Sequence, residues 1–293
     1  MHRRCLAALF AVLVLVSSCA FAEDENSRKV FMAGECEPFA EGEELLTLYV
    51  CPLTGADAML LTYGEHTMLV DTGKKTDFAL LEQMLADAGL DHVDMIFNTH
   101  PHSDHIGGVI PLVESGFPIG KFMTLYPHDH TGNAIVQRSS IETLAEYGIP
   151  IEDMQDGDVI PFGDVKITVM RQEKKVSDND LSAMLMVEYG STRLLLTADV
   201  EYIGQWYLVR MHDLKADIMK YPHHAVSRMN PEFLEAVQPE FVFIPHGSRD
   251  TKNAQKQLNM AGVPFKYATW GPITIESNGE KWIVTQDVYT NLK

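Results

Sequence analysis

The sequence predicts one layered domain of the α/β or α+β class. Short apolar runs that resemble strands gather towards both ends of the chain, and segments with helical spacing lie among them, which is typical of sheets covered by helices. The chain has 293 residues, of which 46% are hydrophobic, and this is enough for one large core. The sequence contains no low-complexity linker, internal repeat or coiled-coil heptad that would divide it.

The first half of the domain is expected to begin with three strands, each an apolar or alternating run between glycine-containing turns: 45–51, 58–63 and 67–70. A helix is expected over 78–88, where apolar residues recur with helical spacing until Gly89 ends the pattern. A fourth strand, 95–98, leads into a polar loop. Helices are expected to follow over 104–115 and 135–147.

The second half is expected to contain two hairpins, one over 159–170 with its turn at 162–164 and one over 183–197 with its turn at 189–191. A helix is expected over 200–212. Four short apolar runs then complete the set of expected strands: 217–219, 241–244, 273–275 and 282–285.

The N-terminus has the features of an export signal, expected to span residues 1–22. A basic start at Arg3-Arg4 precedes an apolar stretch over 6–16, and Ala20-Phe21-Ala22 forms a small-x-small cleavage site. The apolar stretch is too short to cross a bilayer, which needs about 20 residues. The residues before Cys19 also resemble a lipobox, so a lipid anchor at Cys19 is an alternative to simple secretion, which the cleavage site favours. No transmembrane segment is expected in the mature chain.

The chain is strongly acidic, with a formal net charge of −18. Loss of the signal, which holds two arginines and no acidic residue, would make the charge two units more negative. An acidic surface disfavours tight binding of long nucleic acids, because non-specific polyanion binding needs a basic surface. Residues 23–44 are polar and acidic and are expected to form a loose extension before a domain at 45–293.

Two cysteines would remain after cleavage, Cys36 and Cys51. Disulfides persist in proteins that leave the cytoplasm, so a bridge between these two is one alternative. A buried, reduced thiol at Cys51 is the other.

Residues 100–105 are the most informative stretch of the chain, because they hold three imidazoles and one carboxylate. They are His100, His102, Asp104 and His105, in a chain with only 12 histidines. Imidazole and carboxylate are ligands for divalent ions such as Zn²⁺, Mn²⁺ or Fe²⁺. The spacing allows one pair to bind one ion while Asp104 and His105 turn towards a second.

This run resembles the H-x-H-x-D-H signature of the metallo-β-lactamase superfamily. Three further stretches follow in that superfamily's order: Val70-Asp71-Thr72-Gly73, Leu194 to Asp199, and Lys220-Tyr221-Pro222-His223-His224. The chain is most similar to the metallo-β-lactamase-like domain of bacterial DNA-uptake (competence) channel proteins, whose patterns match Gly55-Ala56-Asp57-Ala58 and Asn179-Asp180-Leu181-Ser182. The resemblance covers 45–287 and implies a four-layer αββα sandwich with metals at one edge between two sheets.

The resemblance also implies ligands for two metals. His100 and His102 would bind the first ion, Asp104 and His105 the second, and Asp199 would bridge both. Zn²⁺ is the expected metal and Mn²⁺ the alternative. Asp104 would in addition be catalytic, by orienting or deprotonating the attacking water.

The last ligand of the second ion is left open between His223 and His224. The preferred residue is His224, with its neighbour available to support it or to contact substrate. Asp71 is expected to brace a ligating histidine, since metal-bound imidazoles usually donate their other N–H to a carboxylate or carbonyl. His246 and Asp180 are further candidates, His246 because nucleases of the superfamily place a histidine after a comparable strand.

One ligand of the lactamases themselves is absent from the sequence. They have a further histidine before the bridging aspartate, where this chain has residues 178–182. His128 and His130 lie between the H-x-H-x-D-H run and Asp199, but they precede the predicted hairpins and so come before the position at which that ligand is expected. The first metal would then have fewer protein ligands, which makes partial occupancy an alternative and counts against β-lactamase activity.

Together these features predict an exported enzyme that hydrolyses phosphoester or phosphodiester bonds with metal-activated water, because two metals can clamp both oxygens of a phosphoryl displacement. Small or envelope-linked substrates fit the acidic surface better than long nucleic acids. One alternative is a hydrolase of lactones, thioesters or β-lactams. The other is a non-catalytic, metal-dependent binding protein of the cell envelope.

Overall fold

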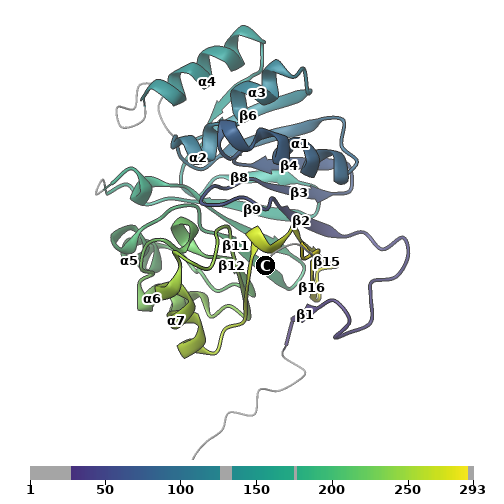
Figure 1. The fold of residues 1–293 in the computed structure, drawn as a ribbon, viewed down its shortest axis with the longest axis vertical. Helices are drawn as coiled ribbons and strands as arrows, with labels where there is room; N and C mark the ends of the chain where they lie inside the picture. Colours follow the sequence, from purple (N-terminus) through teal and green to yellow (C-terminus); the bar gives the residue numbers. More distant parts are fainter. Residues whose placement is uncertain (1–27, 126–133, 175–176, 290–293) are drawn as a thin grey trace, which may run out of the picture.

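The computed structural model describes residues 28–125, 134–174 and 177–289. Two β-sheets lie face to face between two layers of helices, as Figure 1 shows. The expected four-layer αββα arrangement is therefore confirmed.

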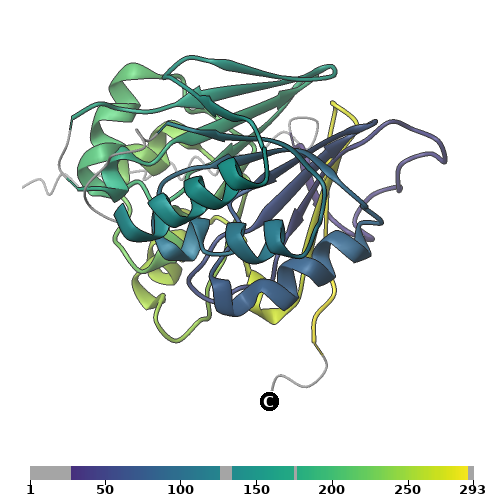
Figure 2. The same ribbon diagram turned by 90° about the horizontal axis from the view of Figure 1, so that it is seen from above.

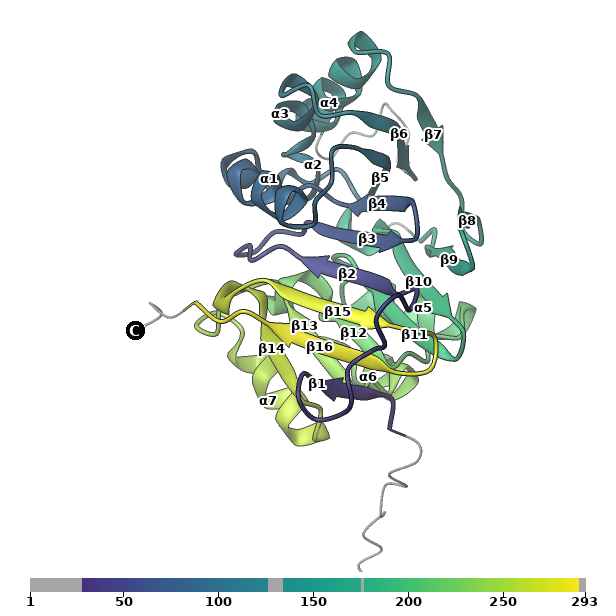
Figure 3. The same ribbon diagram turned by 90° about the vertical axis from the view of Figure 1, so that its right-hand side faces the viewer.

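The first sheet has nine strands, which Figure 3 shows in spatial order. In that order they are β1 (Val30–Met32), β16 (Trp282–Gln286), β15 (Ile273–Ser277), β2 (Leu46–Val50), β3 (Met59–Tyr63), β4 (His66–Val70), β5 (Val93–Asn98), β6 (Ile119–Thr124) and β7 (Ile151–Asp153). Strands β4 to β7 run parallel to one another.

The second sheet has seven strands. In spatial order they are β14 (Phe265–Tyr267), β13 (Phe241–Ile244), β12 (Ile218–Lys220), β11 (Thr192–Leu196), β10 (Met184–Tyr189), β9 (Val165–Met170) and β8 (Val159–Phe162). The two expected hairpins are β8–β9 and β10–β11, and β11 to β14 are parallel.

Helices cover the outer face of each sheet, in two groups that Figure 2 separates by colour. The first group is α1 (Phe78–Asp87), α2 (Ser103–Ile106), α3 (Val109–Glu114) and α4 (Ala134–Glu146), and the second is α5 (Tyr202–Met211), α6 (Pro231–Val237) and α7 (Lys252–Ala261). Side chains alternate between layers along a strand: Met59 and Leu61 face the opposite sheet, and Leu60 faces the helices.

The helix expected over 104–115 is two helices, α2 and α3, separated by Gly107 and Gly108. A Cβ at Gly108 would lie 2.2 Å from the carbonyl oxygen of Thr72. The glycines therefore let the chain after the histidine run pack directly against the end of β4, which fixes the position of that run.

Several elements were not expected from the sequence. Strand β6 contains Gly120 and Lys121, which hide its apolar pattern, and Gly120 is needed because a Cβ there would lie 2.4 Å from the carbonyl oxygen of Asp94. Strands β7 and β14 are only three residues long. The expected loose extension over 23–44 also contributes β1, which pairs in parallel with β16.

The bridge between Cys36 and Cys51 does not form, since both are free thiols. Cys51 is buried behind β2, and burial raises its pKa to about 12, so it is an unreactive core residue. Within the described ranges, no helix combines the length and apolar character needed to cross a bilayer.

Candidate metal centre

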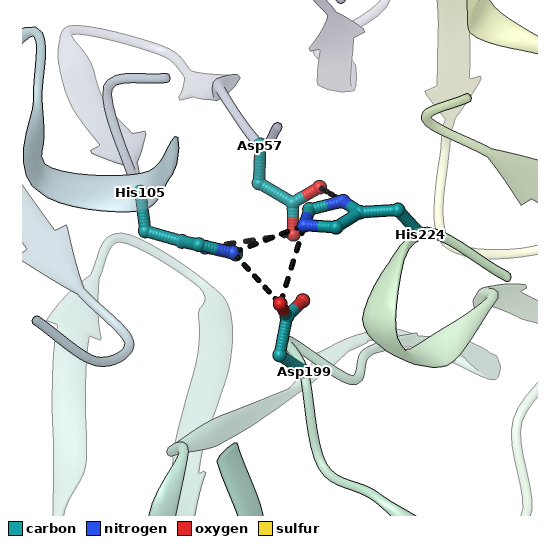
Figure 4. Close-up of side chains that lie close together, drawn as sticks. All are labelled: Asp57, His105, Asp199 and His224. Carbon is teal, nitrogen blue, oxygen red and sulfur yellow. Dashed lines mark hydrogen bonds and ion pairs between the residues drawn. The ribbon is translucent and has the colours of Figure 1, made fainter. Parts of the chain in front are cut away.

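The candidate ligands lie where strands end at one edge between the sheets. The loop after β5 carries residues 100–105, Asp199 follows β11, and His223 and His224 follow β12. Parallel strands place their carboxyl ends on the same side of a sheet, so the β11–β12 pair brings Asp199 close to the two histidines. The loop before β3 adds Asp57 to the same place (Figure 4).

Three ligand atoms form a nearly equilateral triangle. The Nε2 atoms of His105 and His224 are 3.2 Å apart, and Oδ2 of Asp199 lies 3.1 Å from the first and 3.2 Å from the second. Metal–nitrogen bonds of 2.0–2.1 Å put neighbouring tetrahedral ligands about 3.3 Å apart, so the triangle fits one face of a metal coordination shell. Oδ2 of Asp104 lies 3.4 Å from Nε2 of His224 and offers a fourth ligand.

Carboxylates hold the far nitrogen of both histidines. Nδ1 of His105 lies 2.6 Å from Oδ2 of Asp71, and Nδ1 of His224 lies 3.1 Å from Oδ1 of Asp57. Each contact turns Nε2 of that ring towards the other and towards Asp199. Asp71 itself is fixed by hydrogen bonds from the backbone N–H and hydroxyl of Thr99 and from the Asn98 amide. Asp71 therefore has the bracing position expected for it.

The change Asp71→Asn is expected to weaken metal binding by about 10- to 100-fold, because it removes the negative charge that orients the His105 ring. Asp94→Asn is the matched control: the Asp94 carboxylate on β5 accepts hydrogen bonds from the backbone N–H and the hydroxyl of Thr67 on β4, and so also links these two strands. Metal affinity, measured by chelator competition, should fall only in the first variant. Equal losses in both would show a general weakening of this strand pair.

Asp57 and Lys220 lie in stretches that match the family's patterns, but the sequence analysis gave neither of them a role at the centre. Asp57 belongs to a buried group with His105, Asp199 and His224 whose ligand atoms lie within 4.8 Å of one another. Its Oδ2, however, lies 2.6 Å from Nζ of Lys220, a fully buried side chain that also donates to the carbonyl oxygen of Ala198. We therefore interpret Asp57 as a brace for His224 and a partner for Lys220.

Of the remaining predicted ligands, His100 and His223 lie near the Asp199 carboxylate, and His102 lies against His100. Nε2 of His100 lies 3.9 Å from Oδ2 of Asp199, is buried, and has no hydrogen-bond partner among the described residues. The His102 ring lies against that of His100, with centroids 4.6 Å apart. Nε2 of His223 also lies 3.9 Å from Oδ2 of Asp199. An orphaned buried nitrogen beside a carboxylate is the environment that a metal ion satisfies.

Two further candidates have other roles in the structure. Oδ1 of Asp180 accepts a hydrogen bond from the backbone N–H of Gly204 and so supports the start of α5. Nδ1 of His246 accepts from the backbone N–H of Gly247, and its ring packs against Gly55. Neither contacts the triangle. His128 and His130 lie outside the described residues.

The backbone at these strand ends is held in the left-handed region. Five residues that are not glycine have positive φ there: Asp71, Ala198, His223, His224 and Ala225, at 56°, 46°, 47°, 48° and 64°. Such conformations cost about 1–3 kcal/mol each and are concentrated at functional sites. The fold thus maintains a strained backbone around the candidate metal centre.

Charge at the centre shifts several pKa values. Burial lowers the pKa of His224, but the carboxylates of Asp199 and Asp57 outweigh it and raise that pKa to about 10. Burial also opposes the charged form of His105, yet Asp199 and Asp71 raise its pKa well above the usual value. Burial would raise the pKa of Asp104, but the hydrogen bond with His224 and the charge of His105 lower it to about 2.

These shifts predict opposite pH trends for stability and metal binding. A histidine whose pKa rises on folding contributes to the stability of the metal-free protein, and the contribution is complete at any pH below its pKa in the unfolded chain, 6.5. For His224 this contribution is lost as the pH rises through about 10, its pKa in the folded protein. A metal must displace the same protons, so its affinity should increase with pH over this range. Denaturant unfolding of metal-free protein and chelator competition would measure the two trends. A pH-independent affinity would contradict the assignment of these histidines.

Comparison with known proteins identifies the family. The model of the metallo-beta-lactamase superfamily matches residues 51–246. The chain therefore belongs to the metallo-beta-lactamase superfamily, as its motifs indicate.

Individual relatives agree with this assignment. The chain is 24% identical over 278 residues to ComE operon protein 3 of Bacillus subtilis, covering 83% of this chain and 34% of that protein, which confirms the predicted similarity to competence proteins. It is 29% identical over 119 residues to Ribonuclease Z of Archaeoglobus fulgidus, covering 40% of this chain and 38% of that protein. The chain thus spans little more than a third of the length of these relatives.

A solved structure shows the same fold. The metallo-beta-lactamase fold protein YhfI from Bacillus subtilis matches with a TM-score of 0.56 at 17% identity, covering 80% of this chain and all of that chain. At this identity the likeness concerns the fold alone.

Proposed function

We propose that this protein is a metal-dependent hydrolase of phosphoester or phosphodiester bonds. The observation that carries the proposal is the convergence of Nε2 of His105, Nε2 of His224 and Oδ2 of Asp199 to 3.1–3.2 Å at the sheet edge. These residues and Asp104 would hold a divalent ion. When bound, such an ion polarises a scissile ester and makes water a nucleophile near neutral pH.

The chain's own residues have separate roles in this proposal. Asp104 is only partly buried, with 27% of its side chain exposed, so it can reach a water molecule from solvent and accept its proton. Its lowered pKa keeps it ionised at neutral pH. Asp71 and Asp57 orient the His105 and His224 rings, and Lys220 balances the buried negative charge of Asp57 and Asp199.

The preference for phosphoesters has two supports. Carboxylate ligands suit the hard ions that assist phosphoryl transfer, and one relative in the comparison is named Ribonuclease Z. The formal net charge of −18 favours small or envelope-linked phosphodiesters over long nucleic acids. We further propose export through residues 1–22, with lipidation at Cys19 as the alternative fate.

The first experiment is hydrolysis of a chromogenic phosphodiester by purified protein, stripped of metal and reloaded separately with Zn²⁺ and Mn²⁺. We expect turnover to return with one of these ions and to be lost in His105→Ala. His66→Ala is the control, because His66 is an exposed histidine on β4. Cleavage of a lactone or thioester in place of the phosphodiester would move the function to that class. Metal binding without turnover on either class would favour a binding protein.

A further inference from the structure

Two basic side chains lie over Gly55, beside the candidate metal centre. A Cβ at Gly55 would lie 3.2 Å from Cδ2 and 3.3 Å from Nε2 of His246, and 3.9 Å from Nζ of Lys74. Because residue 55 is a glycine, no side chain of its own fills this point. Both nitrogen atoms thus lie within 3.9 Å of one point, close enough for one small group to contact both. We call these two side chains the Lys74–His246 pair.

The pair lies at the sheet edge that carries the candidate ligands. Lys74 belongs to the loop after β4, and His246 belongs to the loop after β13. Strand β13 is parallel to β12, so its loop leaves the sheet on the same side as His224. Gly55 is two residues from Asp57, which contacts His224 (Figure 4). The Cα atoms of Gly55 and Asp57 can be at most about 7 Å apart, so the pair lies next to the centre.

Backbone hydrogen bonds fix the loop that joins the pair to the centre. The N–H of Gly55 donates to the carbonyl oxygen of Pro245, over 3.1 Å. The N–H of Asp57 donates to the carbonyl oxygen of Asp104, also over 3.1 Å. The first bond ties this loop to the segment that carries His246, and the second ties it to the histidine run. The pair and the centre are therefore held in a fixed relative position.

Both members of the pair can donate further hydrogen bonds. A lysine ammonium has three N–H groups, and Nζ of Lys74 uses one on the carbonyl oxygen of Thr54, over 2.8 Å. Within the described ranges Lys74 has no carboxylate partner. Nδ1 of His246 accepts from the backbone N–H of Gly247 over 2.7 Å, and the carbonyl oxygen of Gly247 is farther away, at 3.2 Å. The neutral ring therefore carries its proton on Nε2, which faces the point above Gly55.

The pair and the centre select different partners. The centre presents carboxylate oxygens and imidazole lone pairs, which suit a cation. The pair presents an ammonium group and a ring N–H, which suit an anion with several acceptor oxygens, such as phosphate. A local positive site of this kind also offsets the repulsion that a chain of net charge −18 exerts on an anionic substrate.

We propose that the Lys74–His246 pair binds a second phosphate group of the substrate, next to the phosphodiester that is cleaved. The preferred substrates are then small phosphodiesters that carry another phosphate. The inference rests on the proposed function for the reaction itself, but phosphate binding by the pair is measurable without turnover. If Lys74 served only to tie its loop to Thr54, a second phosphate on the substrate would make no difference.

The kinetic experiment compares two chromogenic substrates in protein reloaded with metal: thymidine p-nitrophenyl phosphate, with and without a second phosphate on the remaining sugar hydroxyl. We expect the second phosphate to raise kcat/KM by about 10-fold, mainly through a lower KM, because charged hydrogen bonds contribute at least this much. Lys74→Gln should abolish the preference, and Lys74→Arg should retain most of it. Lys75→Gln is the matched control, since it removes the same charge from the exposed neighbour and should retain the preference.

The binding experiment needs no turnover. Metal-free, isotope-labelled protein is titrated with inorganic phosphate, and backbone amide signals are followed by nuclear magnetic resonance. The signals of Gly55 and Gly247 should shift to saturation, with affinity about 10-fold lower in Lys74→Gln and in His246→Leu, and unchanged in Lys75→Gln.

The proposal is overturned if the unchanged protein shows no such shifts, or if Lys75→Gln weakens binding as much as Lys74→Gln. Equal turnover of both substrates would also overturn it while leaving the proposed function intact. Phosphate binding at the pair without any turnover would instead uphold the phosphate site and count against the proposed function.

Discussion

Replacement of Asp199 by alanine is expected to abolish metal binding and hydrolysis together. Its Oδ2 lies within 3.9 Å of Nε2 of four histidines, so the variant removes one carboxylate oxygen that all four rings approach. The loss should exceed the 10- to 100-fold that is typical when only a supporting residue is removed. Metal content after gel filtration and phosphodiester turnover would measure both effects in one preparation.

The control for this variant is Asp250→Ala, which removes an exposed carboxylate from the loop before α7. It should keep full metal content and turnover. If Asp199→Ala retained its metal but lost turnover, Asp199 would contact substrate and the two-metal arrangement would be wrong.

The second large effect concerns stability. Lys220→Met is expected to destabilise the metal-free protein by about 3–5 kcal/mol, because it leaves the buried carboxylate of Asp57 without its partner at 2.6 Å. Methionine fills a similar volume, so the loss reflects charge more than packing. Denaturant unfolding of metal-free protein would give the free energy directly.

The chain supplies a matched control for burial. Nζ of Lys121 lies 2.7 Å from Oε2 of Glu152, nearly the same distance, but on the surface between β6 and β7. Lys121→Met should cost less than about 1 kcal/mol, since exposed ion pairs contribute little. The double variant with Lys220→Met and Asp57→Asn should recover part of the stability. If Lys220→Met lowered the free energy of unfolding by no more than Lys121→Met does, the role given to Lys220 would be contradicted.

The order of motifs along the sequence was enough to predict the fold and to name several of the side chains that lie together at the candidate centre. The H-x-H-x-D-H run and the strand ending at Asp199 identified side chains that the structure places within a few ångströms of one another. Short apolar runs predicted most strands correctly, because buried strands carry a clear period or a continuous apolar run. These signals are local, so they can be recognised in the sequence without any knowledge of the tertiary structure.

Residues whose role depends on tertiary contacts were not assigned in this way. Asp57 lies in a turn-like stretch, and nothing in the sequence indicates that its carboxylate reaches His224. Lys220 ends a buried strand, where a charged residue is normally a sign of exposure. The support of His223 by Glu201 joins two loops 22 residues apart. In each case the evidence is a distance between side chains, which spacing along the chain does not determine.

The placement of the centre between the two sheets has a consequence for folding. Residues 100–105 follow β5 of the first sheet, whereas Asp199 and residues 223–224 follow β11 and β12 of the second. Neither half alone can assemble the set of donors, and a chain interrupted before residue 224 would have only fragments of it. A metal ion would therefore bind only after the two sheets have packed together. Once bound, it would link the loops of one sheet to those of the other.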